Sequence, residues 1–214
     1  FVPNAIAGAL ASSRSPLVTA LVPSATNVTY SVLIPPSRAR LREAGYQTLL
    51  SETGFGAAEE ETLIRAHLSR RPDAMLLTGI HHSAQTRRML LGAGIPVVEV
   101  WDLTDTPIDI CVGFSHVNAG RAVAGEMRAR GHAQAAAVTA ADERARRRRD
   151  AFVAEFEALG GDRVAIADQD GEASLAGGRA ALAALIDSGR VQRGVADCTS
   201  CLSYTPDAAD EEDH

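Results

Sequence analysis

The sequence predicts an α/β protein built on doubly wound parallel sheets. Short apolar runs alternate along the chain with stretches of helical length whose apolar residues recur every three or four positions. The apolar runs are nearly continuous, as expected for strands that are buried on both faces of a parallel sheet. Of the 214 residues, 46% are apolar and 22% are charged, which is typical of globular proteins and excludes a disordered or fibrous chain.

Eight strands are expected in chain order. The first is the apolar run 16–22, which follows a segment rich in Ser and Arg. The others are Gln47–Leu50, Ala74–Thr78, Val97–Val100, Ile108–Gly113, Ala135–Thr139, Val164–Ala167 and Gly194–Asp197. Ligands of parallel sheets bind at the carboxyl ends of the strands, so the loops after Val22, Thr78, Val100 and Thr139 form the expected binding region.

The stretches between the strands are expected to be helices. Phe152, Phe156 and Leu159 show the three- and four-residue spacing of an amphipathic helix. Gly94 followed by Ile-Pro-Val closes one helix and restarts a strand. The helix expected from Tyr30 to Ala44 is interrupted by Pro35-Pro36, and a proline inside a helix costs about 3 kcal/mol.

The cysteines and the acidic tail give little support to a metal or redox site. The three cysteines are Cys111, Cys198 and Cys201, an odd number that makes no disulfide framework. The last two have C-x-x-C spacing, but zinc needs two more ligands at fixed spacing. Residues 203–214 are expected to form an irregular, solvated tail. The weaker alternative there is a metal site built from Asp210, Asp213 and His214. No metal and no cofactor are expected.

Net charge and hydropathy argue against several further classes of protein. The chain has no run of about 18 uncharged apolar residues, so no transmembrane helix and no membrane partner are expected. Its first residues lack the basic-then-apolar layout of a secretory signal, so a cytoplasmic location is expected. The net charge of −6 gives no global reason to bind nucleic acid, and any DNA contact must be local.

Several short motifs follow one another in a recognisable order. They are Val2-Pro3-Asn4-Ala5-Ile6-Ala7-Gly8-Ala9-Leu10, Val22-Pro23-Ser24 with Asn27 and Tyr30, Gly45-Tyr46, Gly94-Ile95-Pro96-Val97-Val98, Val112-Gly113-Phe114, Ala129-Arg130-Gly131-His132 and a basic stretch ending at Phe152. In this order the motifs resemble the LacI-type bacterial transcriptional regulators. Three more resemble the gluconate-type branch of that family: Leu77-Thr78 with His82, Val98-Glu99-Val100-Trp101-Asp102, and Asp142-Glu143-Arg144.

The resemblance implies a periplasmic-binding-protein-like core of two doubly wound parallel-sheet subdomains, the second incomplete. It divides the chain into a hinge helix with its linker (1–13), an N-terminal effector-binding subdomain (14–133), a partial C-terminal effector-binding subdomain (134–202) and the acidic tail. The helix-turn-helix that precedes the hinge in this family is expected to be absent, since the chain starts at the hinge.

The function implied by the resemblance is that of a ligand-responsive DNA-binding regulator, a repressor that acts as a homodimer. Its effector would be a sugar acid such as gluconate, and the missing helix-turn-helix would read the major groove. The hinge helix would enter the minor groove, with Leu10 as the apolar wedge, Ala7 against the groove floor and Asn4 on phosphate. Effector binding would close the subdomains, move the hinge helices apart and lower operator affinity.

A sugar acid needs a fixed cation for its carboxylate and paired donors and acceptors for its hydroxyls. Arg146 and Arg148 precede Phe152, and Arg148 matches the effector-binding arginine of the family. Asp102, at the end of the fourth strand, matches a hydroxyl ligand; a helix or turn cap is the alternative. The other expected contacts are Asn27, Tyr30 stacking on the sugar, Thr78, Phe114 and His82, which is either a ligand or a surface histidine.

Two other classes compete with this interpretation. A solute-binding protein of the same fold would have no DNA-binding role and would need an export signal. An enzyme is not expected, and no catalytic residue is assigned. The sequence has no G-x-S-x-G nucleophile elbow, no P-loop and no G-x-G-x-x-G after a strand.

Overall fold

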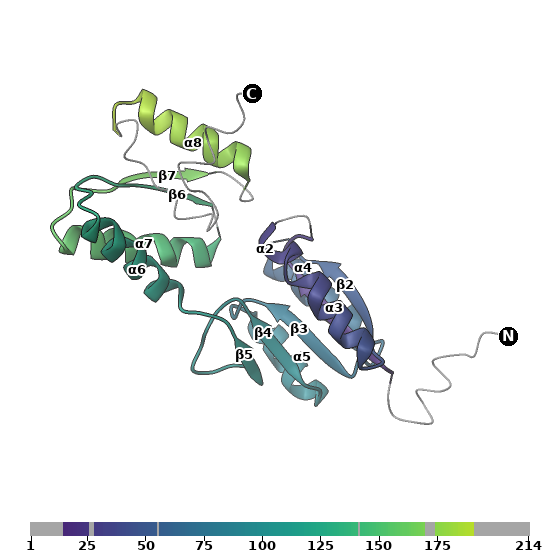
Figure 1. The fold of residues 1–214 in the computed structure, drawn as a ribbon. Helices are drawn as coiled ribbons and strands as arrows, with labels where there is room; N and C mark the ends of the chain where they lie inside the picture. Colours follow the sequence, from purple (N-terminus) through teal and green to yellow (C-terminus); the bar gives the residue numbers. More distant parts are fainter. Residues whose placement is uncertain (1–14, 26–27, 55, 141, 170–173, 191–214) are drawn as a thin grey trace. The chain divides into compact units, whose positions relative to one another are not determined.

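The computed structural model describes residues 15–25, 28–54, 56–140, 142–169 and 174–190. The chain divides into two compact units, Phe1–Phe114 and Ser115–His214 (Figure 1). The expected hinge segment 1–13, the expected strand Gly194–Asp197 and the acidic tail lie outside the described residues. None of the helices in the described ranges combines the length and the apolar character needed to cross a membrane.

The first unit contains a parallel sheet in the order β2-β1-β3-β4-β5. Its strands are β1 (Leu17–Val22), β2 (Gln47–Glu52), β3 (Ala74–Thr78), β4 (Val97–Val100) and β5 (Ile110–Val112). β3 and β4 have the bounds expected from the sequence. β5 is shorter than expected because the backbone N–H of Ile108 donates to the Glu99 side chain instead of joining the sheet.

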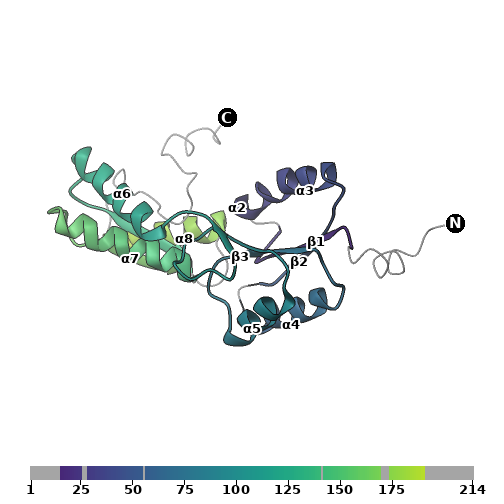
Figure 2. The same ribbon diagram turned by 90° about the horizontal axis from the view of Figure 1, so that it is seen from below.

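Helices cover both faces of this sheet. They are α2 (Val28–Ser31), α3 (Ile34–Glu43), α4 (Ala57–Leu68) and α5 (Ala84–Ala93). α2 and α3 lie on one face, and α4 and α5 lie on the other (Figure 2). The main apolar core of the unit lies between the sheet and the α4–α5 layer, and it consists of Leu21, Ile64, Met75, Leu77, Leu90, Val97 and Ile108. α3 buries none of its residues completely.

The proline pair explains why one expected helix is two. The chain leaves helical structure after Ser31 and starts α3 at Ile34, so Pro35 and Pro36 lie in the first turn of α3. Backbone N–H groups in the first turn of a helix have no partner within the helix. A proline there removes no hydrogen bond, and its fixed φ suits the helix start. The interior-helix cost expected from the sequence therefore does not arise.

In the described part of the second unit, a two-stranded parallel sheet lies between helices. The strands are β6 (Ala136–Ala140) and β7 (Ala165–Gln169), and the helices are α6 (His116–Ala129), α7 (Glu143–Ala158) and α8 (Leu175–Asp187). α6 and α7 lie on one side of the strands and α8 lies on the other (Figure 1). Phe152 and Phe156 of α7 are fully buried in this core, with their rings stacked 5.6 Å apart.

The division between the units differs from the boundary expected after residue 133. It falls after Phe114, so α6 belongs to the second unit. The reason is close packing of α6 on α7. A Cβ atom at Gly120 would overlap the backbone oxygen of Arg148, and it would lie 2.9 Å from the backbone nitrogen of Phe152. This glycine lets the two helix backbones approach directly.

His67 makes the stability of the first unit sensitive to pH. Its side chain is buried on α4, and its Nε2 lies 2.8 Å from Ser51 Oγ. Burial, and then the charge of Arg70, lower the pKa of His67. The unfolded chain therefore binds a proton on the His67 ring more tightly than the folded chain does. The stability that this site contributes to the fold is present above pH ~6.5 and is lost as the pH falls below that value.

We expect the free energy of unfolding of the first unit to decrease as the pH falls from about 7 to about 5. Trp101 is the only tryptophan in the chain, so its emission reports unfolding of this unit in urea. The decrease should be smaller in His67→Gln, which carries no titratable group at this position. Equal pH profiles in the two proteins would contradict this assignment.

Candidate functional site

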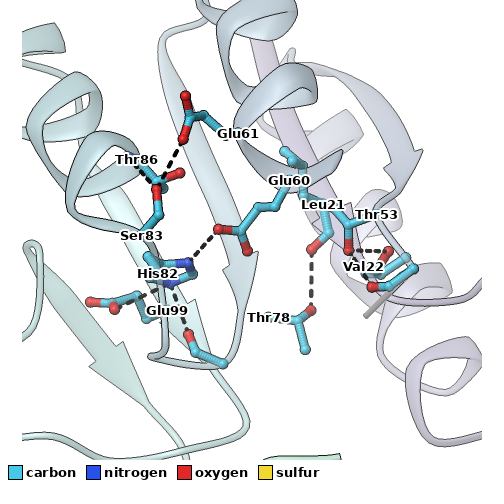
Figure 3. Close-up of polar contacts among 12 residues, drawn as sticks. Leu21, Val22, Thr53, Glu60, Glu61, Thr78, His82, Ser83, Thr86 and Glu99 are labelled. Atoms are coloured by element: carbon cyan, nitrogen blue, oxygen red, sulfur yellow. Dashed lines mark hydrogen bonds and ion pairs between the residues drawn. The ribbon is translucent and has the colours of Figure 1, made fainter. Parts of the chain in front are cut away.

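Threonine hydroxyl groups form hydrogen bonds to the ends of neighbouring strands at the carboxyl edge of the first sheet. Thr78, the last residue of β3, donates from Oγ1 to the backbone oxygen of Leu21 at 3.2 Å (Figure 3). Thr53, directly after β2, donates to the backbone oxygen of Val22 from both its N–H and its Oγ1, at 2.9 and 3.3 Å. These contacts fix the edge where ligands of parallel sheets bind.

The turn after β4 has an unusual backbone. Trp101 has a φ of +72°, and its N–H donates to the backbone oxygen of Val112 at 3.1 Å. Asp102 is 1% exposed, and its Oδ1 accepts from the N–H of Leu103 at 2.8 Å. The backbone of Asp102 packs directly on Gly113, where a Cβ atom would overlap its N and O. The contact to Leu103 holds the Asp102 carboxylate in place, and its role as a hydroxyl ligand stays a prediction.

An aromatic cluster surrounds this turn. The Trp101 ring meets the rings of Tyr30 and Phe114 edge to face, with centroids 6.4 and 6.3 Å apart. The three residues belong to the segments that follow β1, β4 and β5. Tyr30 is only 6% exposed, whereas Trp101 and Phe114 are half-buried. The structure thus brings Tyr30, Asp102 and Phe114 of the expected site together within the first unit. Asn27 lies outside the described residues.

His82 lies inside a network of acceptors (Figure 3). Its side chain is 1% exposed; Nδ1 lies 2.9 Å from Glu60 Oε1 of α4, and Nε2 lies 3.4 Å from Glu99 Oε1 of β4. Nε2 also lies 3.2 Å from the backbone oxygen of Gly79. Glu99 is completely buried, and its Oε2 accepts from the N–H of Ile108 at 2.6 Å.

These contacts favour a positioning role for His82. Carboxylate and carbonyl oxygens accept hydrogen bonds, and a ring N–H of His82 can donate to them. Such a ring holds the loop after β3 between α4 and β4. The burial of His82 differs from the surface location weighed from the sequence; an effector contact stays a prediction. Sequence reasoning did not identify Glu60 as a partner of His82. Glu99 has a sequence signal, because it is a carboxylate within an otherwise apolar strand.

Replacing His82 with Gln is expected to destabilise the first unit by about 3 kcal/mol. The substitution removes the ring that contacts Glu60, Glu99 and the backbone oxygen of Gly79, and it leaves the buried Glu99 side chain without this partner, which is destabilising in proteins. Urea unfolding followed by Trp101 emission measures the effect. The double variant His82→Gln with Glu99→Gln should regain part of the loss, because the unpaired charge is removed. A single-variant loss below about 0.5 kcal/mol would contradict the assignment of these contacts.

Cys111 is a free cysteine of β5. Its Sγ donates to the backbone oxygen of Asp102 at 3.1 Å, and burial raises the pKa of its thiol. A thiol with a raised pKa is a poor nucleophile at neutral pH. Within the described ranges, no group of three or more His, Cys, Asp or Glu side chains is arranged to hold a metal ion. Cys198, Cys201 and the acidic tail lie outside those ranges.

In the second unit, Arg148 is the buried arginine of the basic helix α7. It is 8% exposed, and its Nη1 donates to Nδ1 of His116 at 2.8 Å. Arg149 pairs instead with Asp168, at 2.6 Å, and with Asp150. Burial acts to lower the pKa of Arg149, but these two carboxylates outweigh it and raise the pKa. Arg146 is exposed.

Arg148 therefore differs from its neighbours on α7 in burial and in partner. The Nη1 of Arg148 donates to a ring nitrogen of His116, whereas Arg149 contacts the carboxylates of Asp150 and Asp168. Asp102 and Arg148 belong to different units. His116, which follows the N-cap Ser115 of α6, was missed at the sequence level. His116 and Arg148 are 32 positions apart in the sequence, so local sequence patterns do not reveal the pairing.

Known proteins match both the sequence and the fold. No family model matches the chain. The HTH-type transcriptional regulator GntR of Pseudomonas aeruginosa is 39% identical over 140 residues, which are 65% of this chain and 41% of that protein. A LacI-family transcriptional regulator from Silicibacter pomeroyi is 33% identical with a TM-score of 0.82, covering 89% of this chain and 58% of that one. The transcription regulator GntR from Chromobacterium violaceum is 28% identical with a TM-score of 0.68, covering 85% and 77%.

These similarities define the class of the protein. The chain is related in sequence and in fold to the LacI-type bacterial transcriptional regulators, and its fold is periplasmic-binding-protein-like. Among these regulators it is similar to ones named GntR, so the resemblance inferred from the motifs is confirmed. These relatives are named as transcriptional regulators. The chain spans about two fifths of the length of the curated relatives it matches.

Proposed function

We propose that this chain is the effector-sensing part of a transcriptional repressor that responds to a sugar acid such as gluconate. The observation that carries the proposal is the 39% identity to a regulator named GntR over 65% of the chain. The described units add the kind of side chains that a polyhydroxylated anion requires. A buried guanidinium supplies a fixed cation, and carboxylate and hydroxyl groups supply partners for sugar hydroxyls.

Arg148 is proposed to bind the carboxylate of the effector. Its side chain already gives up conformational freedom to the hydrogen bond with His116, so less entropy is lost on binding. A guanidinium can also meet a carboxylate through two parallel hydrogen bonds, which gives geometric selectivity. Arg146 is exposed, and we propose it as an outer contact that adds positive charge.

Asp102 and Thr78 are proposed to bind effector hydroxyls at the carboxyl edge of the first sheet. Both are held there by contacts to the backbone, Asp102 through Leu103 and Thr78 through Leu21. Phe114 is proposed to pack against the effector. Asn27 is proposed as a further contact from the segment after β1.

The output is proposed to be operator binding by a homodimer in the cytoplasm. Asn4, Ala7 and Leu10 would enter the minor groove, and a helix-turn-helix would read the major groove. Effector binding would then lower operator affinity. By linkage, operator binding must lower effector affinity by the same factor.

A thermal-shift screen tests the proposal. The chain is melted with D-gluconate, 6-phosphogluconate, glucose and xylose. At 100 times its Kd, a bound ligand adds about 2.7 kcal/mol, which corresponds to a Tm rise of several degrees. We expect sugar acids to raise the Tm and neutral sugars to leave it unchanged. A shift with xylose and none with either acid would contradict the proposed effector class.

A further inference from the structure

The backbone of Trp101 departs from the ordinary preference of its residue type. Its φ of +72° lies in the left-handed region, which bulky side chains rarely adopt. Two contacts maintain it, the hydrogen bond to Val112 and the packing of Asp102 on Gly113. Strained conformations that are held in place this way concentrate at ligand-binding and catalytic sites.

Burial within the aromatic cluster separates the roles of its rings. Tyr30, the ring expected from the sequence to stack on the sugar, is only 6% exposed and packs edge to face with Trp101. Trp101 itself is half-buried, in contrast to Tyr30. Trp101 directly precedes Asp102, so one turn carries an aromatic residue and a buried carboxylate. A sugar acid presents both surfaces, because its carbon chain carries apolar C–H groups as well as hydroxyls.

We propose that Trp101 determines effector specificity by contacting the C–H face of a sugar acid, and that Tyr30 supports the Trp101 ring without touching the ligand. This inference rests on the proposed function and names the apolar half of the recognition. The proposal assigns a function to the left-handed turn and to the packing of Asp102 on Gly113. They hold the ring at the sheet edge in the orientation that binding requires, so that little entropy is lost when the ligand arrives.

Trp101→Asn tests the contact. Asn tolerates the left-handed region, so the turn is retained while the ring is removed. By isothermal titration calorimetry, we expect the Kd for gluconate to rise about tenfold or more. The Tm without ligand should not fall by more than about 3 °C. The matched control Tyr30→Phe keeps the supporting ring, and its Kd should stay within about threefold of the unsubstituted chain. A Kd in Trp101→Asn within about threefold of the unsubstituted chain would overturn the inference.

A second measurement needs no substitution. Trp101 is the only tryptophan, so quenching of its emission by acrylamide reports access to this ring alone. Saturating gluconate should lower the quenching constant about twofold or more, and an unchanged constant would overturn the inference. Failure of the proposed function looks different: the unsubstituted chain would then show no heat of binding with gluconate. That outcome removes both proposals, whereas binding without protection of Trp101 removes only the second.

Discussion

Gluconate is expected to lose its stabilising effect when Arg148 is replaced with Ala. The guanidinium is the buried cation assigned to the effector carboxylate, and Ala leaves that carboxylate without a charged partner. Removing one member of such a buried charge pair costs about 3 kcal/mol, which weakens the Kd on the order of a hundredfold. The Tm shift with D-gluconate, measured at a concentration that saturates the unsubstituted chain, checks this result.

Arg130→Ala is the matched control for the loss of one positive charge. Arg130 lies just after α6, with a side chain that is 69% exposed and paired with Glu126. This variant should keep the full gluconate response. Arg148→Lys should show an intermediate response, because an ammonium keeps the charge but loses the planar pair of donors. An Arg148→Ala chain that melts normally and still responds fully to gluconate would refute the role given to Arg148.

Gly120→Ala is expected to destabilise the second unit by about 3 kcal/mol. The added Cβ atom would overlap the backbone oxygen of Arg148, and a helix backbone cannot move aside as a flexible side chain can. The α6 and α7 helices would have to separate at the centre of their contact. Thermal unfolding followed by circular dichroism at helical wavelengths measures the loss.

Gly125→Ala provides the comparison on the same helix. No heavy atom of a neighbouring group lies within 4 Å of a Cβ atom placed at Gly125. Alanine is a better helix former than glycine by about 1 kcal/mol, so this variant should be slightly more stable than the unsubstituted chain. Equal effects of the two substitutions would show that helix propensity, and not close packing, governs Gly120.

The sequence predicted the sheet better than the helices around it. Apolar runs bounded by Gly and Pro place β3 and β4 at their observed limits, because a buried parallel strand has little other sequence character. The break between α2 and α3 was not predicted, although Pro35-Pro36 marked it. The same two prolines are unfavourable inside a helix and acceptable in its first turn, so only the place where α3 begins decides their effect.

Motif resemblance named residues of the proposed site, but it could not describe their environment. Tyr30 and Phe114 both pack on Trp101, the residue before Asp102. The left-handed φ of Trp101 depends on contacts with the segment 112–113, which no local pattern reveals. His82 lies 22 residues from Glu60, and its burial follows from that distant partner. Local sequence patterns do not predict which polar side chains pair when they are far apart in the sequence.

A crystal structure of the chain with bound D-gluconate tests the central claim most directly. Both carboxylate oxygens of gluconate should lie within hydrogen-bond distance, about 2.7–2.9 Å, of the Arg148 guanidinium. A gluconate carboxylate bound to other cations, with no contact to Arg148, would contradict the assignment of this protein as a sugar-acid sensor that works through Arg148.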